Sequence, residues 1–338
     1  MIDLRSDTVT KPSKQMLEFI TRAEFGDDIF GEDPTVNFLQ KKCAELTGKQ
    51  AALFVPSGCM ANQLAIKAHT KPGEEVIVEF NSHIMNYETA APSIISRVQL
   101  LPIKGEQGIM DVNEVKKHIR PKEYYFPRTS LISIENTHNR AGGVIQPIDN
   151  IKEITDLARE MNIKTHLDGA RIFNASVETG ISVKEYASYF DSISFCFSKG
   201  LGAPVGSILC GDFDFIQIAH KWRKILGAGM RQVGVIAAAA LYALDNNVER
   251  LKEDHVKAKY FAEKISQIKG INVDLNTVQT NIVIFSTSKY NKQDFIMKLK
   301  EKGVLISSGS YEFLRAVFHL DVQMCEVQEA IHLISELF

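Results

Sequence analysis

Short apolar segments alternate with helix-like segments along most of this chain, and this alternation restricts the possible folds more than any other feature. Apolar runs of strand length occur at 51–55, 75–79, 130–135, 164–167, 192–197 and 207–210. Helical spacing or capping signals occur between several of them, at 34–47, 62–68 and 151–161. Strands that alternate with helices are typical of an α/β fold with a mostly parallel sheet.

The pattern changes after residue 246. A charged helix is predicted over 248–266, and further elements follow as strands at 281–285, 304–306 and 315–319 and a helix at 292–302. The last helix carries one apolar stripe, formed by Val327, Ile331, Ile334 and Leu337. A chain of 338 residues is long for a single core. We therefore predict a large domain over 1–246 and a small α+β domain over 247–338.

The composition argues against several classes of protein. The net charge of −2 provides no basic surface for nucleic acid or an anionic membrane. No apolar run reaches the length of a membrane span, and the first residues lack the apolar run of a signal peptide, so none is expected. The five cysteines are scattered, so we expect reduced thiols in a cytoplasmic protein, without a zinc site or disulfides.

Two apolar strands end in charged side chains that suit one kind of chemistry. The strand over 164–167 leads to Asp168, and the strand over 192–197 leads to Lys199. Catalysis by pyridoxal phosphate (PLP) requires a lysine that forms a Schiff base and an acid that keeps the pyridine nitrogen protonated. Lys199 and Asp168 are the candidates for these roles. The alternative is that both are surface charges at the ends of strands.

Two loops that follow strands add candidate binding groups. Ser57-Gly58-Cys59 joins a strand to a helix, where free N–H groups and the helix dipole favour an anion such as phosphate. An ordinary tight turn is the alternative. His83 follows the next strand and could lie on a planar ring or take a proton. The alternative for His83 is a loop histidine bonded to the backbone.

Four basic residues have positions that allow a role in binding. Arg171 lies three residues after Asp168 and could make a forked contact with a carboxylate or a ring hydroxyl. Arg315 lies in an apolar strand and needs an anionic partner, which could be a substrate carboxylate or a structural acid. Lys224 and Arg231 lie on or near a basic helix, where solvated surface charges are the alternative.

Several motifs follow one another along the chain in a specific order. They are Asp3-Leu-Arg-Ser-Asp-Thr-Val-Thr10, Phe30-Gly-Glu-Asp-Pro-Thr35, Pro56-Ser-Gly, Ile134-Glu-Asn-Thr-His-Asn139, 166–171 and Ser198-Lys-Gly. Together they resemble the low-specificity L-threonine aldolase family, most strongly over 1–255. The resemblance implies a PLP-dependent enzyme of fold type I, the aspartate aminotransferase type. It also implies a homodimer or homotetramer with active sites at the subunit interfaces.

For the cofactor, the resemblance implies a role for each matching residue. Lys199 would form the Schiff base and Asp168 would bind the pyridine nitrogen. His83 would lie on the ring and act near the substrate hydroxyl, whereas Gly58 and Cys59 would meet the phosphate. Other cofactor contacts are implied for Arg171 and, from the neighbouring subunit, for Lys224 and Arg231.

For the substrate, the resemblance implies that Ser6, Arg171 and Arg315 hold the carboxylate, and that Tyr87 and Tyr125 lie near the substrate. Thr8, Thr10 and Ala203 match a region where some relatives hold a structural cation. The chain departs from the family at three positions. Cys59 replaces a usual threonine, Phe30 a usual tyrosine, and Tyr125 a histidine found in many relatives. The first departure removes a hydroxyl donor to the phosphate, and a thiol is a weaker donor.

The function predicted from these residues is cleavage of L-threonine or L-allo-threonine to glycine and acetaldehyde. The first alternative is a PLP-dependent lyase that performs β-elimination with the same lysine and acid. The second is a catalytically idle protein of the same fold that only binds. A nucleotide-binding domain is a weaker alternative, because the chain lacks both a G-x-G-x-x-G motif and a P-loop.

Overall fold

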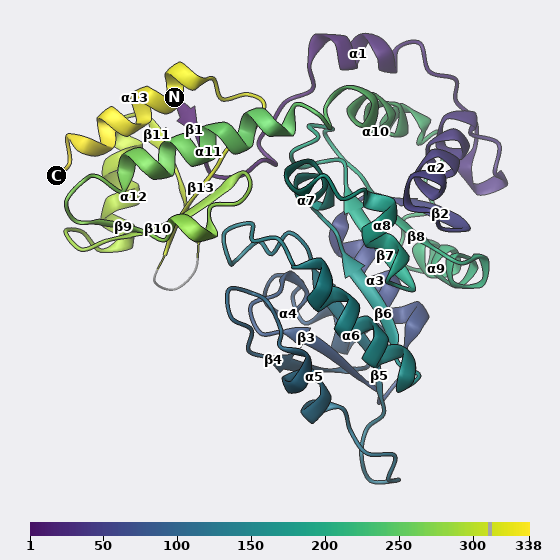
Figure 1. Ribbon diagram of the computed structural model, residues 1–338. Coiled ribbons are helices and arrows are strands. Elements are labelled where there is room, and N and C mark those ends of the chain that lie inside the picture. The colour runs from purple at the N-terminus through teal and green to yellow at the C-terminus, as the bar shows by residue number, and fades with distance from the viewer. Residues whose placement is uncertain (310–312) are drawn as a thin grey trace.

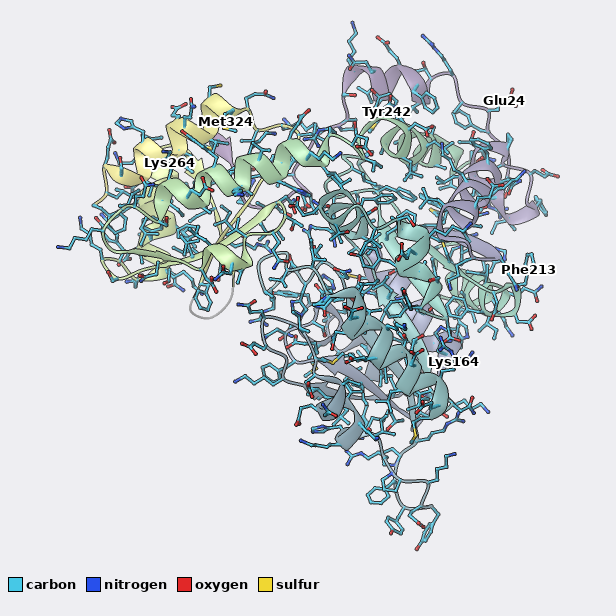
Figure 2. All side chains as sticks on the ribbon, in the orientation of Figure 1. Glu24, Lys164, Phe213, Tyr242, Lys264 and Met324 are labelled. Carbon is cyan, nitrogen blue, oxygen red and sulfur yellow. The ribbon has the colours of Figure 1, made fainter. Side chains whose placement is uncertain are left out.

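The computed structural model describes residues 1–309 and 313–338, which form two lobes (Figure 1). The larger lobe is built on a seven-stranded sheet, and the smaller lobe on a four-stranded sheet. Helix α11 (Leu251–Ile265) joins them, because Leu251 packs in the core of the large lobe and Phe261 in the core of the small one. Figure 2 places Lys264 and Met324 in the small lobe and Phe213 and Tyr242 in the large one.

The large sheet is mostly parallel, as predicted, and has one strand of opposite direction. In spatial order its strands are β2 (Ala51–Val55), β8 (Ser207–Gly211), β7 (Ser192–Cys196), β6 (Lys164–Asp168), β5 (Thr129–Glu135), β3 (Glu75–Glu79) and β4 (Gln99–Ile103). Strand β8 runs antiparallel to both β2 and β7. The carboxyl ends of the other strands therefore meet at one edge of the sheet, where ligands bind in open α/β folds.

Helices flank this sheet. They are α1 (Lys14–Ile20), α2 (Pro34–Thr47), α3 (Gly58–His69), α4 (His83–Asn86), α5 (Val112–His118), α6 (Ile148–Glu160), α7 (Ile172–Thr179), α8 (Val183–Ser188), α9 (Phe213–Ile225) and α10 (Gly234–Asn246), with the short turns η1 (Asp28–Phe30) and η2 (Pro92–Ser96). Helix α2 shows why the sequence predicted its ends. The Asp33 carboxylate accepts the N–H of Val36, Pro34 fits the first turn, and Gly48 ends the helix at φ 66°.

The small lobe has its own hydrophobic core. Its antiparallel sheet has the order β12 (Ser307–Ser308), β13 (Leu314–Val317), β10 (Ile282–Thr287) and β9 (Ile271–Val273), with η3 (Leu275–Thr277) before β10. Helices α12 (Lys292–Glu301) and α13 (Met324–Ser335) cover this sheet together with α11. The predicted stripe of α13 faces that core, since Val327 and Ile334 are fully buried and Ile331 and Leu337 pack beside them.

The first residues of the chain belong to the small lobe. Strand β1 (Ile2–Asp3) pairs in parallel with β11 (Val304–Leu305), and Ile2 and Leu4 are buried in the small core. Residues 6–10 then lead across to the large lobe.

The domain boundary predicted at residue 246 stays a prediction. Among the described residues, no helix has both the length and the apolar character needed to cross a bilayer.

Candidate active site

A cavity of ≈ 330 Å³ lies at the carboxyl edge of the large sheet, between the lobes. It is lined by side chains from five strand ends, from the segment that follows β1 and from β12 and β13. The structure thus brings together most of the residues singled out in the sequence: Ser6, Thr8, Gly58, Cys59, His83, Tyr87, Asp168, Arg171, Lys199 and Arg315.

Asp168 and Lys199 reach the cavity from neighbouring strands, because β6 and β7 pair with Asp168 opposite Ser194. The Asp168 side chain is buried, and its carboxylate accepts hydrogen bonds from Asn62 Nδ2 at 2.8 Å and from the N–H of Ala170 at 3.2 Å. Lys199 lies in the turn after β7, where its carbonyl accepts the N–H of Gly202 at 2.7 Å. Gly202 has φ +77°, a backbone conformation that glycine adopts readily, so a glycine at this position suits the turn that holds Lys199.

His83 begins helix α4 and is held by two buried acids. Its Nδ1 lies 2.8 Å from Glu88 Oε1, and its backbone N–H donates to Glu135 Oε2 at 2.6 Å. Burial disfavours the imidazolium, but the hydrogen bond to Glu88 and the charges of Asp168 and Glu135 raise the pKa of His83 above its ordinary value. The Tyr87 ring lies 5.5 Å from the His83 ring, between centroids.

Three residues of this network, Asn62, Glu88 and Glu135, were not predicted from the sequence. Glu135 could have been found, since it ends an apolar strand in the same way as the strand that leads to Asp168. Asn62 lies on the buried face of α3, and Glu88 lies in the loop after α4. No periodicity distinguishes either residue from a surface position, so only the folded chain shows their role.

The end of the cavity at α3 suits an anion. Ser57 caps this helix by accepting the N–H of Met60 at 3.2 Å, and the N–H groups of a first helical turn have no partner within the helix. A Cβ on Gly58 would lie 2.8 Å from Cys196 Sγ, so a larger residue there would force the Cys196 side chain to shift. Nearby, Ser207 Oγ is buried without a hydrogen-bond partner in the described part of the chain. Burial and the Glu88 carboxylate raise the pKa of Cys59 to about 11, so its thiol stays neutral.

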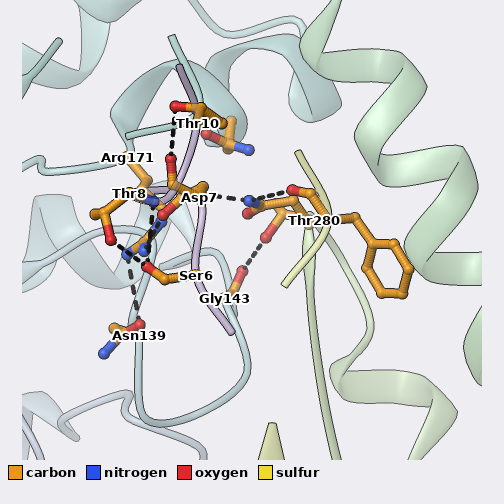
Figure 3. A network of polar contacts seen from close by, with 12 residues as sticks. Ser6, Asp7, Thr8, Thr10, Asn139, Gly143, Arg171 and Thr280 are labelled. Atoms are coloured by element: carbon orange, nitrogen blue, oxygen red, sulfur yellow. Dashed lines mark hydrogen bonds and ion pairs between the residues drawn. The ribbon is translucent and has the colours of Figure 1, made fainter. Parts of the chain in front are cut away.

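The opposite side of the cavity holds two arginines with different partners, the buried Arg171 and the half-buried Arg315. Arg171 forms a forked ion pair with Asp7, at 2.7 and 2.8 Å (Figure 3). Burial would raise the pKa of Asp7, but this arginine brings it well below its ordinary value. Arg315 donates to Asn139 Oδ1 at 2.9 Å and to Ser307 Oγ at 3.2 Å. Among residues 1–309 and 313–338, no carboxylate forms an ion pair with Arg315.

Five other predicted site residues are not among the described residues that line this cavity: Thr10, Tyr125, Ala203, Lys224 and Arg231. Tyr125 is 65% exposed in the loop between α5 and β5, which extends away from the body of the large lobe (Figure 1). Lys224 lies near the end of α9, and Arg231 pairs with Asp27 at 2.9 Å. In the region predicted for a cation, Thr8 Oγ1 donates to Ser6 Oγ at 2.8 Å and Thr10 Oγ1 to the Asp7 carbonyl at 3.3 Å, and Ala203 is buried. These assignments stay predictions.

Cys59, His83 and Glu88 have potential ligand atoms within 4.8 Å of one another, a spacing that a metal ion could use. Both oxygens of Glu88 are already engaged, however. Oε1 accepts from Asn62 and contacts His83, and Oε2 accepts from Gln63 at 2.5 Å. We therefore assign His83 and Glu88 to a hydrogen-bonded network beside the cavity, which Cys59 and His83 line.

The residues present fit PLP. A buried acid and a lysine lie at neighbouring strand ends, a helix terminus suits a phosphate, and a histidine lines the same cavity.

The model of the beta-eliminating lyase family matches residues 3–288. The chain is 44% identical to the low specificity L-threonine aldolase of Escherichia coli K12, over 97% of each chain. It is 41% identical to low-specificity L-threonine aldolase 1 of Arabidopsis thaliana, over 96% of this chain and 93% of the relative.

Solved structures agree on the fold. A threonine aldolase from Leishmania major matches with a TM-score of 0.86 at 17% identity and covers 100% of this chain and 99% of its own. An aspartate aminotransferase from Rhodobacter sphaeroides matches with a TM-score of 0.74 at 15% identity, over 99% and 92% of the two chains. The expected type I fold is confirmed.

Proposed function

The chain belongs to the beta-eliminating lyase family and to the low-specificity L-threonine aldolases, and on that premise we propose that it cleaves L-threonine and L-allo-threonine to glycine and acetaldehyde. The observation that carries this proposal is the convergence of Lys199, Asp168 and His83 on one cavity. These residues provide an amine, a buried acid and a base in reach of one small molecule. The enzyme is a PLP-dependent lyase.

Residues of the large lobe would hold the coenzyme. Lys199 would be the amine that joins it covalently, Asp168 would pair with its ring nitrogen, and the N–H groups at Gly58 and Cys59 would bind its phosphate. When bound, PLP supplies an electron-accepting ring that weakens the bonds at the substrate Cα. Asn62 keeps Asp168 turned toward the cavity, because its amide donates to Asp168 Oδ2 at 2.8 Å.

His83 is the proposed base for the substrate hydroxyl. Its Nδ1 lies 2.8 Å from Glu88 Oε1, which only accepts when ionised, so Nδ1 carries the hydrogen. In the neutral imidazole, Nε2 is then the free basic nitrogen. His83 Nε2 takes the proton from the β-hydroxyl as the Cα–Cβ bond breaks and acetaldehyde leaves.

Arg315 is the proposed anchor of the substrate carboxylate. Arg171 is already neutralised by Asp7, whereas Arg315 has only neutral acceptors among the described residues. Binding of a carboxylate there would fix the orientation of the Cα–Cβ bond relative to His83 and Lys199. Ser6 and Tyr87 line the same side of the cavity and complete the proposed substrate contacts.

Beta-elimination is the second candidate function, because the matching family bears that name. It would use Lys199 to remove the Cα proton and would not require His83 as a base for a hydroxyl.

To distinguish the two functions, the purified protein is incubated with PLP and with L-threonine or L-allo-threonine. Glycine and acetaldehyde in equal amounts, and neither product without PLP, are expected. Formation of 2-oxobutyrate and ammonia instead, or of no product, would overturn the aldolase proposal.

We also propose that the enzyme assembles as a homodimer or homotetramer with its active sites at the interfaces. Lys224 and Arg231 are not among the described residues that line the cavity of their own chain, which supports their predicted action on a second subunit. Exposed apolar side chains support the same proposal: Phe30 is 71% exposed and Tyr124 97%. Light scattering of the purified protein tests it, since a monomer would contradict it.

The cellular role is proposed from the same reaction. The enzyme would break down threonine and supply glycine in the cytoplasm, and the five unpaired cysteines suit a reducing compartment. A structural cation near Thr8, Thr10 and Ala203 remains a prediction, which metal analysis of the purified protein tests. For this cation the chain offers hydroxyl groups that already donate to protein oxygens.

A further inference from the structure

Asn62 lies at the centre of the polar wall of the cavity, and the mechanism above uses only one of its hydrogen bonds. The residue lies on α3 and is 2% exposed. Its Nδ2 donates to Asp168 Oδ2 at 2.8 Å and to Glu88 Oε1 at 2.8 Å. An amide nitrogen carries two hydrogens, so each carboxylate receives one of them.

The oxygen of this amide is fixed from the other side. Asn62 Oδ1 accepts from Ser194 Oγ at 3.1 Å and lies 3.3 Å from His166 Nε2. Because an amide oxygen only accepts, His166 Nε2 carries a hydrogen. Burial lowers the pKa of His166 to about 4, so the ring is neutral near pH 7 and its Nδ1 is an acceptor.

The chain of hydrogen bonds continues in one direction. His166 Nδ1 lies 2.9 Å from Ser192 Oγ and therefore receives the hydroxyl hydrogen. Ser192 Oγ can then accept from His69 Nε2, which lies at 2.8 Å. Every donor in the series from His69 to Asn62 points toward the two acids. Turning the amide over would place its oxygen against two carboxylates and its nitrogen against two donors, so one orientation is strongly favoured.

We propose that Asn62 is a positioning residue that couples the two acids of the site: Asp168, which serves the coenzyme nitrogen, and Glu88, which serves His83. This inference rests on the proposed function. One amide group holds both carboxylates, so any change in the hydrogen bonding of one acid changes the donor available to the other. The coenzyme site and the base are thereby linked through protein, in addition to any contact that they make across the cavity.

The charged and titratable groups around His83 allow the coupling to be measured. They come from several elements and are Glu88, Glu135, Asp168, Cys59 and Tyr87. Loss of the Asn62 donor leaves the Glu88 carboxylate more basic, which stabilises the imidazolium. The titration midpoint of His83 therefore rises when Asn62 is removed.

The test compares Asn62→Ala with the matched control Gln63→Ala, because Gln63 Nε2 donates to Glu88 Oε2 at 2.5 Å and makes no hydrogen bond to Asp168. In the full-length chain without coenzyme, NMR of histidines labelled at Cε1 follows the titration of His83, with His83→Gln for assignment. We expect the titration midpoint of His83 to rise in both variants. PLP affinity, measured by absorbance, should fall roughly tenfold in Asn62→Ala only, since only that change frees Asp168.

The proposal is overturned if Asn62→Ala changes only one of these two quantities or neither. Ser194→Ala is a milder variant that removes one bond to the amide oxygen but keeps the amide, and it should move both quantities in the same directions by less. Both measurements are independent of turnover. A wild-type protein that cleaves no threonine would refute the proposed function. A change in only the His83 titration midpoint or only the PLP affinity of Asn62→Ala would refute only the coupling.

Discussion

The two sides of the cavity differ in how completely their charges are paired. The coenzyme wall is formed by Asn62, His83, Glu88, Asp168 and Lys199. The Asn62 amide donates hydrogen bonds to both Glu88 and Asp168, and Glu88 in turn binds His83. The carboxylate wall, formed by Ser6, Asp7, Asn139, Arg171 and Arg315, contains one complete ion pair and one arginine whose partners among the described residues are all neutral. The first wall is set before any ligand arrives, whereas the second leaves one charge for the ligand.

Because of this difference, one arginine of the cavity should contribute mainly to stability and the other mainly to binding. A buried arginine that has its acid contributes mainly to the folded state, because removal of either partner leaves an uncompensated charge. A half-buried arginine without an acid has lost part of its hydration, and this cost is compensated when an anion binds. Arg171 and Arg315 lie in the same cavity, and both contact Asn139 Oδ1, yet they should respond to mutation in different ways.

The largest effect is expected on the coenzyme wall. Lys199→Ala removes the amine that joins the coenzyme and should abolish acetaldehyde release. The measurement is acetaldehyde formation coupled to an alcohol dehydrogenase, with circular dichroism to verify the fold. Lys41→Ala, an exposed lysine on α2, is the matched control and should keep full activity. Turnover that persists in Lys199→Ala would refute the assignment of this lysine.

On the carboxylate wall, Arg315→Ala should lower kcat/KM by about 100-fold or more, because it removes the charge that pairs with the substrate carboxylate. Most of the loss should appear in KM. The unfolding midpoint in urea should not fall, since Arg315 has no buried acid to leave unpaired in the described part of the chain. A loss of stability with normal KM would assign Arg315 a structural role instead.

Asp7→Asn should show the opposite pattern. It leaves Arg171 without its acid and should cost about 3 kcal/mol in the free energy of unfolding, measured with urea. Coenzyme affinity should change much less than stability. If the variant were as stable as the wild type, the proposed division between Arg171 and Arg315 would be wrong.

The same pair predicts how stability depends on pH. Asp7 has a lowered pKa in the folded chain, so its contribution is complete above the pKa of an unfolded aspartate, about 3.9, and is lost as the pH falls below it. The difference in unfolding free energy between wild type and Asp7→Asn should therefore shrink on acidification. A difference that stays constant down to acidic pH would contradict the ion pair.

A smaller effect is expected from Glu88→Gln. The Glu88 carboxylate raises the pKa of His83, so the base becomes free only above the ordinary histidine value. Replacement by an amide should move the acid limb of kcat/KM toward lower pH and change the rate at high pH little. Gln63→Ala, which should move the limb the other way, is an internal control. An unmoved limb would show that another group than His83 controls it.

The smallest effect concerns the phosphate end. Cys59→Thr replaces a thiol by a hydroxyl, a stronger hydrogen-bond donor, and should tighten PLP binding by roughly fivefold. The dissociation constant is measured by titrating the coenzyme-free protein with PLP. Cys325→Ser, an exposed thiol on α13, is the control and should leave the constant unchanged. Weaker binding in Cys59→Thr would show that this side chain does not face the phosphate.

Strand ends were the part of the site that the sequence could predict. Asp168, Lys199 and His83 each follow an apolar run, and parallel strands place such residues at one edge. The acid that pairs with Arg171 lies 164 positions away in the chain, and pairing over that separation leaves no periodic signal. Asn62 was hidden for a different reason, since a polar residue on a helix usually faces water.

The fold was predictable to a similar degree. Strand 75–79 and helix 34–47 agree with the structure, because capping residues and turn glycines mark their ends. The reversed direction of β8 was not predicted, since an apolar run carries no information about direction. The pairing of β1 with β11 was also missed, because only two residues of each strand take part.

That pairing has a consequence for synthesis of the protein. Residue 2 is made about 300 residues before its neighbour at residue 304. The N–H of Val317 donates to the carbonyl of Leu4, so the segment that carries Ser6 and Asp7 is anchored only after residue 317 has been made. A nascent chain that has completed the seven-stranded sheet would still lack the anchor for the substrate carboxylate, and catalytic competence should arise only after the strand of Arg315 has joined the small sheet.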